Sequence, residues 1–268
     1  MKKKILSLML ASAIAASAFG MVACIGDGGD RDDKITADTD PATIKSEQVA
    51  DEAAWQAAFD YTGIANFSAR SVMRRERDGK VYTKGDSTLT MTADKYGIDG
   101  TYTSRKYDDE TNDYVMENGE WVLETRPQKS FAAVGDGKNY QYEYDDTEKA
   151  WYRKETDNDV MKYAKLDFRQ YETAYNGFAE FTFENGAYTA TFKEDDDDID
   201  NVSDVETYTI KIQNGKIVYF GYVEEWSDND EDEPETGKTV SSIIVFNVGK
   251  TTVTLPTDFK TVISSDEE

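Results

Sequence analysis

Hydrophobic and polar residues alternate with a period of two over most of the chain after residue 66, a pattern typical of antiparallel strands. In the first two expected strands, Phe67 and Met73 fall on one face, as do Leu89 and Met91. We predict about ten or eleven strands in sequential hairpins, with two helices. Because a flat sheet of that size would expose long edges and a wide apolar face, we expect one curved meander sheet or half-barrel, a mainly β (α+β) fold.

Turn signals between the strands fix the expected hairpins. Asp78-Gly79, Asn118-Gly119, Asn185-Gly186 and Asn214-Gly215 are dipeptides that adopt the positive φ angles of a type I′ turn. Further hairpin and strand segments are expected at Tyr140–Tyr144 with Trp151–Arg153, at Val240–Val248, and at Val253–Pro256, where the proline requires an edge or an end.

Two segments have the spacing of helices. The first is expected to begin at Ser46 as its N-cap and to run to about Phe59, with Trp55 and Phe59 as an i,i+4 aromatic pair. The second is expected over Val160–Tyr175, before Gly177. We interpret the first as a helix lying on the sheet; a lid over a ligand is the alternative.

The N-terminus has the pattern of an export signal. Three lysines at 2–4 precede an uncharged run from Ile5 to Ile25, which predicts a signal peptide over 1–23. The run Met21-Val22-Ala23-Cys24 resembles the lipobox of bacterial lipoprotein precursors, and this resemblance implies a diacylglycerol thioether on Cys24, the chain's only cysteine. A retained transmembrane helix and a free thiol are the alternatives. Two or three acyl chains would anchor the protein to the extracytoplasmic face of the cell membrane.

The remaining domain boundaries follow from composition. Residues 24–45 carry almost no large apolar side chain, which predicts a flexible acidic tether; cation binding by its aspartates is the alternative, at Asp27, Asp30, Asp32 and Asp33. Residues 46–263 form the predicted single β-rich domain. The acidic end at 264–268 is expected to be a disordered tail.

Composition excludes several classes of function. The formal charge of −24 argues against nucleic-acid binding, which depends on Lys and Arg at phosphates. The chain has no histidine, so imidazole-dependent nucleophiles and metal ligands are absent. We therefore expect no enzyme activity and no cofactor; a carboxylate-based hydrolase is the remaining catalytic alternative.

Two acidic runs, 195–200 and 228–233, suggest calcium loops at first inspection. Asp196, Asp198 and Asp200 match the first ligand positions of an EF-hand, but Asn201 stands where Gly is needed and Thr207 where Glu is needed. The second run also lacks both residues. We therefore predict solvated hairpin loops and no metal site, with weak adventitious calcium binding as the alternative.

The order of elements resembles the LolA/LolB and mycobacterial LppX/LprG type of lipoprotein. The features that carry this resemblance are 55–59 leading into 67–73 and the hairpins at 118–121 and 148–151. Such proteins fold as half-barrels, and the resemblance implies a concave face that carries lipid. The Trp-x-x-Ala-Phe helix is also similar to that of uncharacterised surface lipoproteins of Gram-positive gut bacteria, which implies location only.

These patterns lead to one expected function and one main alternative. We expect a membrane-anchored, exported lipoprotein with a non-catalytic binding or structural role at the cell surface, whose protein partner, if it has one, is not specified by the sequence. The alternative is a carrier of lipid or another apolar ligand. Six residues form either the core face or the lining of such a ligand cavity: Trp55, Phe59, Phe67, Met73, Leu89 and Met91.

Overall fold

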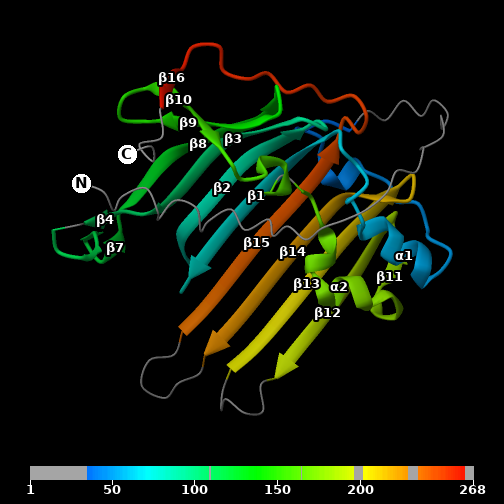
Figure 1. Ribbon diagram of the computed structural model, residues 1–268. Coiled ribbons are helices and arrows are strands. Elements are labelled where there is room, and N and C mark those ends of the chain that lie inside the picture. The colour runs from blue at the N-terminus through cyan, green and yellow to red at the C-terminus, as the bar shows by residue number, and fades with distance from the viewer. Residues whose placement is uncertain (1–34, 109, 164, 196–201, 229–234, 263–268) are drawn as a thin grey trace.

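The fold is a single large sheet with short helical segments against it (Figure 1). The computed structural model describes residues 35–108, 110–163, 165–195, 202–228 and 235–262. The predicted mainly β class is confirmed. The sheet has twelve strands: β1 (Phe67–Arg77), β2 (Lys80–Met91), β3 (Lys95–Arg105), β8 (Leu123–Gly135), β9 (Lys138–Asp145), β10 (Ala150–Thr156), β11 (Thr182–Glu184), β12 (Ala187–Asp195), β13 (Val202–Gln213), β14 (Lys216–Asp228), β15 (Glu235–Phe246) and β16 (Lys260–Val262).

The strand order is that of a meander that is interrupted once. The order is β11-β12-β13-β14-β15-β1-β2-β3-β8-β9-β10-β16, so the last long strand, β15, pairs with the first, β1. The chain therefore crosses the sheet between β10 and β11. All the pairings are antiparallel except that of β16 with β10. Two small ribbons extend the connection from β3 to β8: β4 (Tyr107–Asp108) with β5 (Asp113–Tyr114), and β6 (Met116–Glu117) with β7 (Glu120–Trp121).

The predicted turns are confirmed. All four dipeptides have positive φ at both residues, for example 51° at Asn214 and 67° at Gly215. This geometry matches the right-handed twist of the flanking strands, and it fixes the register of each hairpin. The expected pairing of Trp151 with Tyr144 is also present.

The first helix begins later than predicted. α1 spans Glu52–Phe59, and Asp51 rather than Ser46 accepts from a backbone N–H of its first turn. The Ser46 hydroxyl instead accepts from the Ile212 amide at 2.8 Å. Residues 46–47 also donate backbone hydrogen bonds to Gly186 and Ile212, so this segment lies extended along the sheet before the helix begins.

The predicted continuous helix over 160–175 is wrong. The segment forms the short helical turns η2 (Val160–Tyr163) and η3 (Phe168–Gln170) and the one-turn helix α2 (Glu172–Asn176), before η4 (Phe178–Glu180). Asp167 interrupts it: its backbone is extended, and its carboxylate accepts from the Arg169 amide at 3.0 Å and guanidinium at 2.8 Å. Such local side-chain hydrogen bonds compete with helix continuation.

The last strand is also displaced from its predicted place. Residues 253–256 form no strand, and the final pairing is made instead by Lys260–Val262. Pro256 has no N–H to donate to a neighbouring strand. The segment instead runs past the sheet and packs Phe259 against Tyr142, with ring centroids 5.4 Å apart.

The structure differs from the expected tether over residues 35–45. Arg70 donates to the Ala37 carbonyl at 3.0 Å, and Lys211 donates to the Ile44 carbonyl at 2.8 Å. Ile44 itself is buried, and residues 41–43 form the helical turn η1 (Pro41–Thr43). Two basic side chains of the sheet therefore hold an acidic, apolar-poor segment through its backbone carbonyls.

The core lies between the sheet and the helical segments. Trp55 and Phe59 of α1 are fully buried, and the ring of Phe59 meets that of Phe220 on β14. Trp55 contacts four further rings with centroids within 5.6 Å, those of Phe59, Phe178, Phe181 and Tyr188. The helices therefore fill the apolar part of this face with aromatic side chains.

Several predicted features lie outside the described residues. These are the signal peptide, Cys24, the first part of the tether, most of both acidic runs and the acidic tail. Within the described ranges, the helices are too short and too polar to cross a membrane.

Candidate functional site

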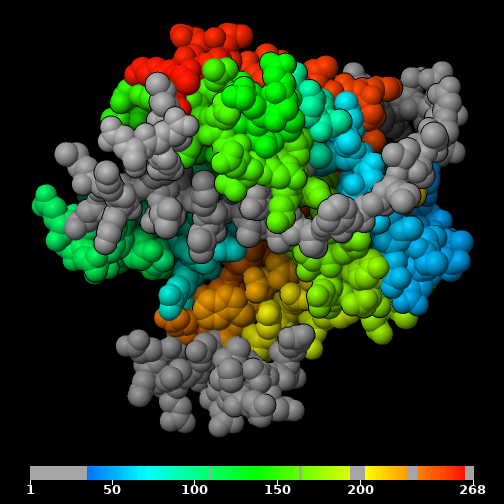
Figure 2. Space-filling model, viewed as in Figure 1, coloured from blue at the N-terminus to red at the C-terminus, as the bar shows by residue number. Residues whose placement is uncertain are grey.

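Uncovered sheet surface remains at the ends of β1, β14 and β15, away from the helices. The space-filling view shows gold and orange atoms of β14 and β15 exposed to the left of the yellow-green helical segment (Figure 2). Two hollows lie at these strand ends. The smaller, of about 180 Å³, is lined by Arg77, Tyr82, Arg105 and Trp226, which we call the arginine cleft. The larger, of about 410 Å³, also includes Trp226.

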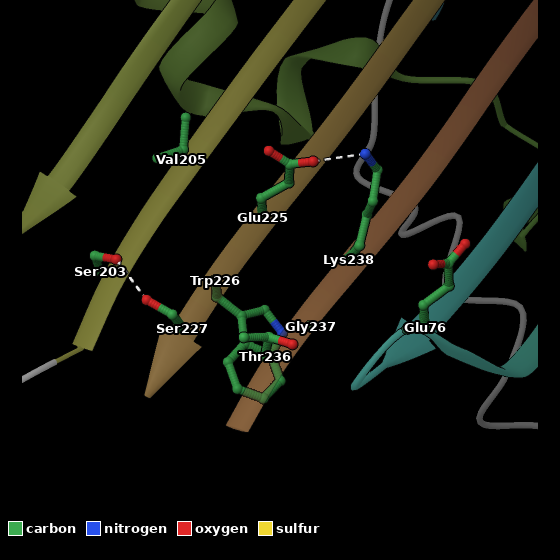
Figure 3. A pocket seen from close by; sticks show the side chains of 10 residues that line it. Glu76, Ser203, Val205, Glu225, Trp226, Ser227, Thr236, Gly237 and Lys238 are labelled. Carbon is green, nitrogen blue, oxygen red and sulfur yellow. Dashed lines mark hydrogen bonds and ion pairs between the residues drawn. The ribbon is translucent and has the colours of Figure 1, made fainter. Parts of the chain in front are cut away.

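Trp226 is positioned by a glycine on the neighbouring strand. It pairs with Gly237 across β14 and β15, and its ring lies directly over that residue (Figure 3). A Cβ atom at Gly237 would come within 2.1 Å of the indole ring, far inside van der Waals contact. Gly237 is therefore needed for the ring to lie flat on the sheet, where it lines both hollows.

Arg105 is held by aromatic rings. Its guanidinium carbon lies 3.9 Å from the ring centroid of Tyr114, 5.0 Å from that of Trp121 and 5.3 Å from that of Tyr82. Such contacts are worth roughly 0.5–2 kcal/mol each. Within the described ranges, no ion pair or hydrogen bond joins this guanidinium to another residue. Its faces are therefore packed, while its N–H donors have no protein acceptor there.

Arg77, the second arginine of the cleft, is neutralised. It forms an ion pair with Glu235, which holds the pKa of the Arg77 guanidinium above its ordinary value, chiefly through the hydrogen bond between them. The adjacent turn is fixed to β15, because the Thr236 amide donates to the Asp78 carboxylate at 2.9 Å. Among the residues that the structure describes, the arginine cleft therefore carries one positive charge without an ion-pair partner, on Arg105.

Six of the ten residues that line the larger hollow are polar or charged. Most of its lining residues alternate with Trp226 along the strands, so they lie on the sheet face opposite α1 (Figure 3). Lys238 pairs with Glu225 at 2.5 Å, and the hydroxyls of Ser203 and Ser227 are 2.8 Å apart. Since these polar groups are paired with one another, they offer few fixed partners to a ligand.

A tyrosine–carboxylate network lies between the core and the uncovered strand ends. The hydroxyls of Tyr208 and Tyr222 each donate to Glu206 at 2.9 Å. Burial, followed by the bond to Glu206, raises the pKa of both tyrosines well above the ordinary value. Both phenols therefore stay protonated donors, and they satisfy a half-buried carboxylate at the margin of the core.

The six residues predicted to form a core or ligand face do not line either hollow. Five of them, Trp55, Phe59, Phe67, Leu89 and Met91, are buried in one hydrophobic cluster. Met73 lies beyond this cluster on β1 and is half-buried. These five residues therefore pack against one another in the core.

The residues of the arginine cleft were not predicted as a site. They come from four strands and lie between 5 and 149 residues apart in the chain, and no local motif joins all of them. Arg105 reads in the sequence as an ordinary charged residue at a strand end, and Trp226 as a strand aromatic before an acidic loop. The only local signal is the pair of isolated aromatic residues, Tyr82 and Trp121, beside two hairpin turns.

The described residues contain no group of three or more acidic, cysteine or histidine side chains close enough together to hold a metal ion. Comparison with known proteins assigns no family. No protein-family model matches the chain, and no curated protein sequence is significantly similar to it.

Proposed function

We propose that this protein is an exported, lipid-anchored bacterial protein that binds a polar ligand at the cell surface without transforming it. The observation that carries the binding role is the arginine cleft, in which the indole of Trp226 and the guanidinium of Arg105, which has no ion-pair partner among the described residues, line one hollow. Anchoring rests on the lipobox resemblance of residues 21–24, and the absence of histidine supports a non-catalytic role.

We do not extend the proposal to lipid carriage. A carrier of the half-barrel type needs an open apolar volume of several hundred Å³ between helices and sheet. At this position Trp55, Phe59 and Ala174 are fully buried against the strands. An acyl chain would have to displace these rings, at a cost of several kcal/mol.

The anchoring part is tested by Cys24→Ser. The variant should move from the membrane fraction to the soluble fraction, while its domain keeps the melting temperature of the wild type. Ser12→Ala, which alters the same apolar run but leaves the cysteine, is the matched control and should stay with the membrane. Retention of Cys24→Ser on membranes would contradict the proposal.

The binding part is tested by a thermal-shift screen of neutral sugars, sugar acids, amino acids, short peptides and inorganic anions. We expect at least one compound to stabilise the wild type and to lose its effect in Trp226→Ala. Trp226→Phe, which keeps a flat ring, should retain part of the effect, and Trp151→Ala should retain all of it, since Trp151 does not line the cleft. No stabilising compound in the panel, or equal loss in both alanine variants, would contradict a binding role for this cleft.

A further inference from the structure

We infer that the arginine cleft binds the end of a saccharide that carries a single carboxylate. This inference rests on the proposed binding function and names its ligand class. In the bound state, Arg105 would hold the carboxylate through its N–H fork, and the rings of Trp226 and Tyr82 would pack against the apolar face of the sugar.

The packing of Arg105 prepares it to bind an anion. Three rings within 5.3 Å of its guanidinium carbon restrict the side chain, so little rotamer freedom remains to be lost on binding. Charge-assisted bonds from guanidinium to carboxylate are frequently bidentate and about twice as strong as neutral hydrogen bonds. A restrained guanidinium without an acid partner in the described chain can therefore donate hydrogen bonds to a carboxylate ligand.

The charge of the cleft limits the ligand to one negative group. Arg77 is already paired with Glu235, which leaves Arg105 as the one cation of the lining that has no ion-pair partner in the described part of the chain. The whole chain carries a formal charge of −24, so a polymer with many negative groups would be repelled along its length. At physiological salt, a screening length of about 8 Å still allows one anionic group to interact locally with Arg105.

The size of the cleft favours a terminal group over a whole small molecule. Its volume of about 180 Å³ is below the roughly 300–1,000 Å³ of pockets that enclose an entire small ligand. A single ring at the end of a longer chain fits this volume, while the rest of the ligand stays in solvent. The flat aromatic side chains, Trp226 and Tyr82, provide the apolar surface that such a ring would cover.

The hydrogen-bonding chemistry of the lining favours a saccharide over a peptide. Two guanidinium groups and one indole N–H only donate, and the phenol of Tyr82 is the one side chain of the lining that can also accept. Sugar hydroxyls and a carboxylate can serve as acceptors throughout. A peptide end would bring backbone N–H groups that need acceptors which this lining scarcely offers.

The test measures binding of methyl glucuronide, its neutral counterpart methyl glucoside, and N-acetylphenylalanine, which presents a carboxylate as a peptide end does. Ligand-observed NMR titrations give Kd for the wild type, Arg105→Met and Arg153→Met. Arg153 is the matched control because its guanidinium is also stacked on two rings, those of Tyr140 and Phe259, but lies outside the cleft. Melting temperatures of both variants confirm that each remains folded.

We expect methyl glucuronide to bind at least tenfold more tightly than methyl glucoside, with that difference lost in Arg105→Met and kept in Arg153→Met. Arg105→Lys, which keeps the charge without the planar fork, should retain only part of the preference. Equal affinity for the two sugars, tighter binding of N-acetylphenylalanine, or equal losses in the two methionine variants would overturn the inference. If only the glucuronide fails while another screened compound depends on Trp226, this inference falls alone; if nothing binds, the proposed binding function falls too.

Discussion

Replacement of Trp55 by alanine should remove the side chain that joins α1 to the crossing segment and the sheet. Trp55 is fully buried, its ring contacts four other aromatic rings, and its indole N–H donates to the Ala174 carbonyl of α2 at 3.0 Å. Trp55→Ala therefore creates a cavity at the meeting point of these elements and leaves the carbonyl without its partner.

The expected loss of stability is about 4–6 kcal/mol. Large aromatic to alanine substitutions in cores cost about 3–5 kcal/mol, and a buried carbonyl that loses its donor costs about 1–3 kcal/mol more, partly relieved if water enters. Since domains are stable by only about 5–15 kcal/mol, this loss should remove a large fraction of the total stability. Its urea midpoint should fall by about 1.3–2 M if the slope is near 3 kcal/mol/M.

Urea unfolding followed by far-ultraviolet circular dichroism measures this loss, with Trp151→Ala as the control. Trp151 is only half-buried, and its ring meets those of Phe131 and Tyr144 at 5.3 Å on the sheet. Its removal should cost about 1–2 kcal/mol. Equal midpoints for the two variants would refute the argument that α1 is held to the sheet through Trp55.

Three further predictions concern turns, charge and metal. Gly215→Val should lower the free energy of unfolding by more than about 1 kcal/mol in urea, because a β-branched residue resists a φ of 67°. The loss is not due to a clash, since no atom lies within 4 Å of an added Cβ. An unchanged midpoint would show that the turn tolerates another geometry. Asp86 forms a bidentate pair with Arg70, and the hydrogen bond from Arg70 lowers the pKa of the Asp86 carboxyl. The stability that this pair contributes is therefore present above the ordinary pKa of 3.8 and is lost as pH falls through the lowered pKa. Because Asp86 is 46% exposed, Asp86→Asn should cost less than about 1 kcal/mol at pH 7, and it should flatten the acid limb of a pH–stability curve; an unaltered limb would contradict the pairing. Millimolar calcium should raise the melting temperature no more than magnesium does at equal ionic strength, because neither acidic run has both the Gly and the late Glu of a calcium loop. A shift of many degrees with calcium alone would contradict this prediction.

Local patterns in the chain specify the hairpins and their faces. Each Asn-Gly or Asp-Gly dipeptide restricts two consecutive φ angles, and the alternation of the flanking residues admits only one register with the apolar side covered. Both are properties of a few adjacent residues. The β class, the turn at Asn214-Gly215 and the burial of Phe67, Leu89 and Met91 therefore followed from local patterns.

The helical boundaries depended on contacts between distant parts of the chain. Ser46 has the chemistry of an N-cap, but its hydroxyl binds the Ile212 amide, 166 residues away, and the helix begins after Asp51 instead. The spacing over 160–175 suits a helix, but Asp167 and Arg169 form local bonds that end the first turn, and the buried Leu166 and Phe168 are placed by the sheet. Propensity is a weak term, and tertiary packing overrides it by several kcal/mol.

The position of β1 in the sheet, and the residues that meet at its end, depend on long-range strand pairing. The pairing of β15 with β1 closes the sheet order, and no turn signal announces it, because it joins segments about 170 residues apart. That pairing, with those of β2, β3 and β14, brings Arg77, Arg105 and Trp226 into one cleft. The sequence thus determined the strands and their faces through short-range geometry, whereas the cleft exists only because long-range hydrogen-bond ladders set distant strands side by side.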